Sequence, residues 1–411
     1  MGPRSNGGAV HEPEQSSEET TTTPQPDFSL VLGGPLYQLF RRAHLSGDTL
    51  QLLHRRMLII SAVAWLPLLL LSALAGDALG GAATIPFFYD IEAHVRFLVV
   101  LPILIAAELI VHKRLRPVIR QFIERRLVAP EDLPKFQQAI DSTLRVRNSL
   151  VGEVALLVLV YTVGIWVWRT QIALETATWY AVPQDEGTQL TPAGYWYLFV
   201  SLPIFQFILA RWYLRFGLWF WFLWQVSRLE LRLIPIHPDR TAGLSFLGRS
   251  TNAFVPILVA HGAMLAGLIA SQIFYAGHDL AAFKLGIASF VAFLLVVMLS
   301  PLTVFGPQLW RAKRRGLGEF GRLAGRYVRD FEEKWVHGGA PADEALIGSA
   351  DIQSLADLGN SYAVVQEMRF VPFSLKDAIR LAAAVAAPLL PLTLTIFSLE
   401  ELAGHAIKFL F

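Results

Sequence analysis

The sequence predicts an all-α integral membrane protein with about seven transmembrane helices, arranged as three hairpins plus one terminal span. Two observations predict this class. Only 17% of the 411 residues are charged, whereas soluble domains contain about 25%. In addition, seven apolar stretches approach the roughly 20 residues that a helix needs to cross a bilayer. These stretches are residues 57–76, 97–112, 149–168, 194–217, 252–275, 284–309 and 381–398.

The loops between these stretches differ in their Lys and Arg content. When successive loops are assigned to alternate sides, the side that holds the N-terminus carries 29 of the 35 Lys and Arg residues. Cytoplasmic loops are enriched in these residues, so we expect a cytoplasmic N-terminus and an external C-terminus. Because the first span begins only after 56 residues, we expect it to be a retained signal anchor.

The residues that precede the first span form two predicted parts. Residues 1–28 are rich in Ser, Thr, Glu and Pro, which is typical of a disordered tail, here a cytoplasmic one. Residues 29–56 contain two short amphipathic pieces, the second of which ends at Arg55 and Arg56. Such a segment favours the membrane interface, so we expect it to lie along the cytoplasmic surface.

Residues 57–309 are predicted to form a six-span membrane domain. Its second span, 97–112, is short and must cross nearly upright or thin the bilayer locally. Residues 113–148 combine helical apolar spacing with basic residues, which predicts a cytoplasmic helical insert. The run 194–226 would be about 50 Å long as one helix. We therefore expect a span and then an inner helix, with a break near Gly217; a single span shifted inward is the alternative.

The last hundred residues are predicted to be a second cytoplasmic segment followed by one span. Apolar residues recur at helical spacing within 310–380, which predicts two or three short helices. Basic residues at the start of this segment indicate an anchor for anionic lipid head groups; they are Arg311, Lys313, Arg314 and Arg315. Residues 381–411 are predicted to form the terminal span and a short outer tail.

Charged residues within the apolar stretches are the strongest candidates for a functional site. Glu108, Glu153 and Arg211 all lie within roughly 10 Å of the predicted inner boundary, at a rise of 1.5 Å per residue. Charged side chains at such depth turn inward and pair, and one guanidinium can hold two carboxylates. His261, near the middle of the fifth span, is a candidate to join them or to relay protons. Arg215, one turn from Arg211, is a secondary member.

This intramembrane charge cluster has two interpretations. As a functional site, it would couple transport to the movement of protons or ions. As a structural feature, it would be an ion pair that fixes helix packing, or a group of side chains that snorkel to the interface. The sequence leaves both interpretations open.

Two loops contain further polar candidates. On the predicted outer side, Asp90 and His94 would share a helix face at i, i+4, a spacing that suits two ligands of a metal. Polar residues at a helix entry, level with the lipid head groups, are the simpler interpretation. On the inner side, His237, Asp239 and Arg240 lie in a loop stiffened by proline. This loop is a candidate for gating or docking, or a plain connector.

The sequence contains little that indicates an enzyme or a cofactor. Residues 316–321 formally match the dinucleotide-binding fingerprint, but that motif requires a preceding buried strand, and none is expected here. Zinc-protease, nucleophile-elbow and P-loop motifs are absent. We therefore expect no cofactor, no metal and no nucleic-acid partner.

Three stretches resemble a family of bacterial inner-membrane proteins. They are PFFYDIEAHVRFLVVLPILIAAE (86–108), PIHPDRTAGLSFLG (235–248) and DIQSLADLGN (351–360). The resemblance covers most of the chain after the N-terminal tail. It implies a polytopic protein of the bacterial cytoplasmic membrane and no particular activity.

The leading functional hypothesis is a transporter or channel-like protein that uses the layer of Glu108, Glu153 and Arg211. The alternative is a membrane scaffold or signalling protein that binds a cytoplasmic partner through the basic segments 113–148 and 310–380. An intramembrane enzyme acting on a lipid is a third class, but no motif supports it.

Overall fold

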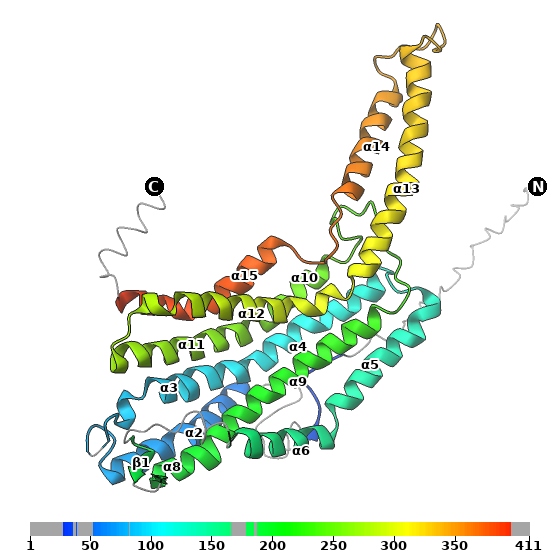
Figure 1. Cartoon of the computed structure of the whole chain (residues 1–411). Helices are drawn as coiled ribbons and strands as arrows, with labels where there is room; N and C mark the ends of the chain where they lie inside the picture. Colours follow the sequence, from blue (N-terminus) through cyan, green and yellow to red (C-terminus); the bar gives the residue numbers. More distant parts are fainter. Residues whose placement is uncertain are drawn as a thin grey trace, which may run out of the picture.

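The computed structural model describes residues 28–35, 38, 52–81, 83–164, 166, 178–184 and 187–395. These residues form an elongated bundle of long helices, and one helical hairpin projects from it (Figure 1). The strands of the described part are β1 (Ala181–Gln184) and β2 (Gly187–Leu190), an antiparallel pair in which Ala181 faces Leu190. The described chain is otherwise helical, which confirms the predicted all-α class.

Six helices of the described part are long and apolar enough to cross a membrane. They are Leu53–Ala75, Ile91–Glu124, Pro192–Val226, Phe246–Ala276, Leu280–Thr303 and Leu375–Thr395. A seventh crossing results if Pro130–Arg147 and Leu150–Gly164, which meet at a 47° bend, are counted as one broken span. Six or seven candidate spans identify an integral membrane protein, because each apolar helix needs a lipid or protein environment.

The first half of the chain forms α2 to α6 and the second half α8 to α15. The first set is α2 (Leu53–Ala75), α3 (Ile91–His94), α4 (Leu101–Glu124), α5 (Leu133–Arg147) and α6 (Leu150–Leu159). The second set is α8 (Pro192–Trp196), α9 (Leu202–Val226), α10 (Phe246–Ser250), α11 (Val255–Ala276), α12 (Lys284–Thr303), α13 (Gly306–Phe331), α14 (Ala350–Gln366) and α15 (Leu375–Ala386).

Short π- and 3-10-helical turns extend or join these helices. The π turns are Val95–Val100, Val160–Gly164, Tyr197–Ser201 and Glu332–Val336. The 3-10 turns are Phe87–Tyr89, Pro130–Asp132, Thr251–Phe254, Leu280–Phe283 and Ala387–Thr395. Through them α3 runs into α4 and α8 into α9, so that each pair makes one continuous helix.

Two predicted spans are longer than expected. The helix 91–124 has 34 residues and the helix 192–226 has 35, with no break at Gly217. The predicted short second span and the predicted break are therefore wrong. Each helix is about 50 Å long, so about 20 Å of it extends beyond a 30 Å hydrocarbon layer. The helix continues past Gly217 because aromatic residues of its last turns are buried: Trp219 and Phe222 lie in the core.

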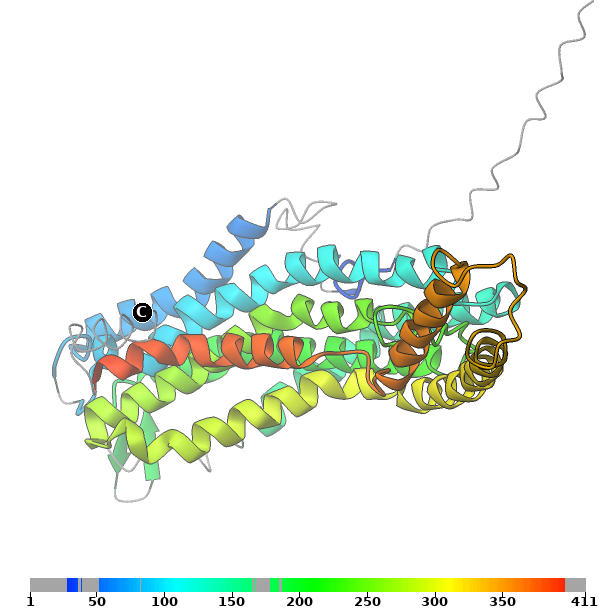
Figure 2. The same cartoon turned by 90° about the horizontal axis from the view of Figure 1, so that it is seen from above.

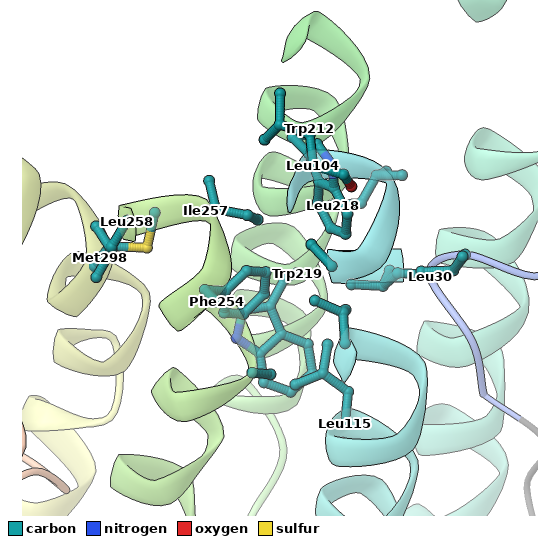
Figure 3. Packing of buried hydrophobic residues seen from close by; sticks show 14 of the residues in the cluster. Leu30, Leu104, Leu115, Trp212, Leu218, Trp219, Phe254, Ile257, Leu258 and Met298 are labelled. Carbon is teal, nitrogen blue, oxygen red and sulfur yellow. The ribbon is translucent and has the colours of Figure 1, made fainter. Parts of the chain in front are cut away.

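The segment before α2 also differs from the prediction. Phe28, the last residue of the predicted disordered tail, is buried, and its ring centroid is 5.0 Å from that of Phe222. Leu30 and Val31 are also buried instead of lying along a membrane surface. Figure 3 shows Leu30 beside the region where Leu115 and Trp219 meet. Large apolar side chains in this segment fill a gap between α4, α5 and α9, which gains more than interfacial burial. The predictions for residues 1–27 and 39–51 lie outside the described residues.

The C-terminal third of the described chain departs from the predicted span boundaries. The sixth span ends at Thr303, not at residue 309, and α13 begins at Gly306 in a new direction. One long helix, α13, and one shorter helix, α14, form the projecting hairpin, at the opposite end of the bundle from the β-hairpin (Figures 1 and 2). The last span begins at Leu375, where Ser374 and Asp377 form a capping box, and residues 396–411 lie outside the described chain.

Close packing of α11 against α15 depends on a glycine. A Cβ atom on Gly262 would lie 2.1 Å from the carbonyl oxygen of Val385. Small residues allow membrane helices to approach one another closely. Gly217, in contrast, has no atom within 4 Å of the position of its missing Cβ, in keeping with its place on the exposed face of an unbroken helix.

Gly262→Ala is expected to lower the stability of the protein by about 1–3 kcal/mol, because overpacking forces the two helices apart. The measurement is the midpoint of thermal unfolding of the purified protein in detergent. Gly217→Ala is the control and should be neutral or slightly stabilising, since alanine favours a continuous helix by about 1 kcal/mol over glycine. A midpoint unchanged by Gly262→Ala would contradict the close approach of α15.

Candidate functional site

A network of buried charges joins four helices in the middle of the bundle. Glu108 of α4 lies 2.9 Å from Arg215 of α9 and also pairs with Arg56 of α2. Arg211 of α9 lies 3.5 Å from Glu153 of α6. All five side chains are nearly inaccessible to solvent. We call these residues the charge network.

The positions of these side chains follow from helix geometry. Glu108 lies on the buried face of α4, with Leu104 and Val111 at helical spacing on either side. Arg211 and Arg215 are one turn apart and point to the same side of α9. Trp212, whose indole donates to the Leu104 carbonyl at 2.9 Å, holds α9 against α4 (Figure 3). The register of the two long helices therefore places Glu108 at the level of Arg215.

The pairing differs from the prediction in two respects. Arg211 was expected to hold both carboxylates, but Glu108 pairs with Arg215 and Arg56 instead. Arg56 was expected at the interface, yet it lies within α2 and is buried. One feature of the sequence points to the burial of Arg56: it follows Arg55 directly at the start of an apolar run. Which of the two arginines faces inward depends on the rotation of α2.

Little space is left around the charge network. Two cavities of about 20 Å³ each adjoin it, one lined by Glu108 and Arg56 and the other by Glu153 and Leu30. A cavity of that size holds about one water molecule. A Cβ on Gly34 would lie 3.2 Å from Oε1 of Glu153, so the segment before α2 covers the network on that side. The charge network is thus paired and closely packed, with room for only about one water molecule in each adjoining cavity.

His261 does not join the charge network. Its Nδ1 faces the carbonyl of Ile257 at 2.7 Å and therefore carries the hydrogen, while Nε2 accepts a hydrogen bond from the hydroxyl of Tyr213 at 2.7 Å. Tyr213 lies on α9 between the two network arginines in sequence, but on another face of the helix. His261 and Tyr213 therefore belong to a separate site.

That separate site is a crevice of about 340 Å³ between α3, α9, α11 and α12. Most of its lining is apolar, and Met264, Leu268 and Phe290 contribute to it. Its polar side chains are the hydrogen-bonded His261 and Tyr213 and, on the helix 91–124, Glu92 and Arg96. Arg96 lies 3.6 Å from Glu92 and donates to the hydroxyl of Tyr197. The prediction anticipated His261 but not the crevice.

The two outer polar candidates serve local structure. Asp90 caps α3 by accepting from the Ala93 N–H at 2.9 Å, and its other oxygen accepts from the indole of Trp179 at 2.9 Å. His94 accepts from the indole of Trp65 at 3.0 Å and donates to the Phe88 carbonyl at 3.1 Å. Both ring nitrogens of His94 are thus engaged. Within the described residues, no group of three or more His, Asp or Glu side chains could hold a metal ion.

The loop with His237, Asp239 and Arg240 is held in a defined conformation by hydrogen bonds and an ion pair. Asp239 accepts hydrogen bonds from the backbone N–H groups of residues 241, 243 and 245 at 2.8 to 3.1 Å. Arg240 pairs with Glu367 at 2.8 Å, and its carbonyl accepts from the Arg369 N–H. Arg240 and Ala242 adopt positive φ angles of 57° and 53°, which the surrounding bonds must hold in place. The loop ties the base of the α13–α14 hairpin to α9.

These contacts determine the pKa of the Asp239 carboxyl group. Burial by itself raises the pKa of the Asp239 carboxyl, but the three backbone N–H groups outweigh burial and hold the pKa below the ordinary value of 3.8. The folded protein therefore favours the ionised form. This contribution to stability is fully present at pH values above the ordinary pKa of Asp. It is lost as the pH falls through the lowered pKa of the folded state.

The dinucleotide-like residues 316–321 lie inside α13, and no strand precedes them. Their first glycine has a packing role, because a Cβ on Gly316 would lie 2.5 Å from Cβ of Pro235. The neighbouring basic residues divide into two groups. Lys313 donates to the Met368 carbonyl at 2.9 Å, and Arg314 lies over the ring of Trp310. Arg311 and Arg315 line a cleft instead.

Comparison of the chain with protein-family models, curated proteins and solved structures finds no match. The resemblance to bacterial inner-membrane proteins therefore stays a prediction, and function must be argued from the geometry of the chain.

Glu108→Gln is expected to destabilise the protein by about 3–5 kcal/mol, because it leaves two buried arginines without their shared carboxylate. Thermal or denaturant unfolding in detergent measures the effect. Arg232→Gln is the control: the Arg232–Glu131 pair spans 3.8 Å at an exposed site, and exposed pairs contribute about 0–1 kcal/mol. Equal losses for the two variants would contradict a buried network.

Asp239→Asn is expected to cost about 1–3 kcal/mol at pH 7, since the ionised acceptor of three backbone N–H groups is lost. The difference from the wild type should persist down to the ordinary pKa of 3.8 and shrink as the pH falls below it, because the stabilisation is lost between the ordinary and the lowered pKa. Unfolding midpoints at several pH values test this. Asp343→Asn, in an exposed loop, should cause no loss at any pH; a pH-independent Asp239→Asn effect would contradict the charge-based role.

Proposed function

We propose that the protein is a membrane transporter in which the 340 Å³ crevice is the substrate chamber and the charge network is a closed gate. We also propose a location in the bacterial cytoplasmic membrane, with seven spans and the N-terminus inside. The distribution of 29 of 35 Lys and Arg residues supports that orientation. The crevice within the membrane-spanning helices is the observation that carries the proposal.

The crevice has the size and chemistry of a small-molecule site. Sites for small ligands measure about 300–1,000 Å³ and are mostly apolar, with a few polar groups that fix the ligand's orientation. Here those groups are an imidazole, a hydroxyl, a carboxylate and a guanidinium. A neutral or zwitterionic amphipathic solute fits this pattern better than a metal ion or a multiply charged anion.

The charge network suits a gate because its pairs join four helices. A shift of α9 would break the pairs of Arg211 and Arg215 together. Tyr213 of the crevice lies between Arg211 and Arg215 in sequence, which links the two sites through α9. Buried ionisable groups in spanning helices are by default candidates for such functions, since their burial is costly.

A second candidate function is a membrane scaffold or signalling protein. The projecting α13–α14 hairpin supports it, because the hairpin stands clear of the bundle (Figure 1). Several of its apolar side chains are exposed. Examples are Val328 and Ile352. Such a surface is suited to binding another protein. In this case the charge network would serve helix packing alone.

The test of transport uses the purified chain in proteoliposomes with protons, alkali cations and a panel of neutral and zwitterionic amphipathic solutes. Met264→Trp should fill the crevice and reduce the flux of the transported solute at least ~10-fold, because the chamber cannot hold both the indole and the solute. Leu285→Trp on α12 is the matched control; it is 75% exposed, does not line the crevice, and should leave flux unchanged.

Three results would count against the proposal. Full flux through Met264→Trp would exclude the crevice as the chamber. Unchanged flux and coupling in a folded Glu108→Gln protein would exclude the gate. If no solute crosses faster than in empty liposomes, the transport proposal is wrong and the scaffold alternative applies. The scaffold alternative predicts one reproducible protein partner, whose binding is lost when residues 322–361 are replaced by a short linker.

A further inference from the structure

A second cavity, large enough for a ligand, lies away from the crevice and the charge network. It is a cleft of about 830 Å³ where α9 ends, α12 ends and α13 begins. Residues of the connection 227–233 form one wall, and the first turns of α13 form the other. The proposed transport function uses none of these residues, so the cleft calls for a separate explanation.

The cleft is basic. Arg311 and Arg315 lie one turn apart on α13 and line it together with Arg228 from the end of α9. Glu230 is the acidic residue of the lining, so the formal excess is two positive charges. Within the described residues, none of these three arginines forms a salt bridge. Their guanidinium groups suit a phosphate, which accepts paired N–H donors.

A buried acceptor adds to the basic groups. Gln308 donates its amide hydrogens to the carbonyls of Ser227 and Leu229 at 2.8 and 2.7 Å. These two bonds fix the orientation of the amide, and its oxygen is buried without a hydrogen-bond partner. Gln308 lines the cleft. A buried polar atom without a partner is costly, and a hydroxyl group on a ligand would satisfy it once the wall of the cleft moves to admit the ligand.

The level of the cleft identifies the source of the phosphate. Two candidate spans end at its edge, at Val226 and at Thr303. Trp224 lines the cleft and Trp310 follows in α13, both partly exposed, and Trp prefers the headgroup region of a bilayer. A phosphate at this level belongs to a phospholipid whose acyl chains lie along α9 and α12.

We propose that this cleft is a binding site for the phosphate of an anionic, hydroxyl-bearing phospholipid headgroup, with Arg228, Arg311 and Arg315 as its ligands. The proposal divides the basic run at the start of α13. Arg311 and Arg315 bind lipid, whereas Lys313 holds the Met368 carbonyl and Arg314 stacks on Trp310. Basic pockets at the ends of spanning helices are a known means of headgroup recognition.

The test measures binding of short-chain phosphatidylglycerol to the purified full-length protein in detergent by native mass spectrometry. The double variant R311Q/R315Q should bind it at least ~10-fold more weakly, since two charged contacts are lost. R314Q on the same helix is the matched control and should change affinity less than about 2-fold, because Arg314 does not line the cleft.

A second variant distinguishes a specific loss of binding from misfolding. E230Q removes the negative charge of the cleft and should tighten phosphatidylglycerol binding, an effect that a damaged fold cannot produce. Equal affinities of the wild type and R311Q/R315Q would overturn the proposal, as would equal affinities for phosphatidylglycerol and phosphatidylcholine. Displacement of the lipid by inorganic phosphate or glycerol phosphate at similar concentrations would overturn the lipid assignment and indicate a soluble phosphate ligand.

Discussion

The buried ion pairs of Glu108 are the constraint on which the rest of the structure depends. A carboxylate within a spanning helix is stable only when cations reach it, and here Arg215 and Arg56 do so from two other helices. These contacts fix the rotation of α2, α4 and α9 about their own axes. Arg211, one turn away, then brings α6 into position through Glu153. Apolar side chains alone would tolerate other rotations, because lipid and leucine are equally apolar.

Because the rotation of α9 is fixed, its opposite faces contribute to two different sites, the charge network and the crevice. One face carries the arginines of the network, and the other presents Tyr213 to His261 and the crevice. The same helix ends at Val226, beside the basic cleft. A single rigid helix about 50 Å long thus spans the charge network, the proposed chamber and the headgroup level. Because the helix has no break at Gly217, a movement of α9 would displace its residues in the charge network, in the proposed chamber and at the headgroup level.

Much of the secondary structure could be predicted from the sequence. Apolar run length and helical spacing depend only on neighbours in the chain, so the apolar runs were correctly located on helices, although the ends of several helices were not. The failures occurred where distant residues intervene. Phe28 was assigned to a disordered tail and Leu30 to an interface, because their partners lie far along the chain; these partners are Phe222, Trp219 and Leu115. Gly217 suggested a break, but α4 and α5 support the projecting half of α9, and glycine in a helix costs only about 1 kcal/mol.

The sequence by itself determined that the chain is an all-helical membrane protein and that Glu108, Glu153, Arg211 and Arg215 need partners, since the cost of a charge among apolar residues is local. It could not determine the pairs. Whether Arg55 or Arg56 reaches Glu108, and whether His261 meets a carboxylate or Tyr213, depends on helix rotation. Rotation is set by contacts between residues tens to hundreds of positions apart. For the same reason, only the tertiary structure could separate Arg311 and Arg315 from Lys313 and Arg314.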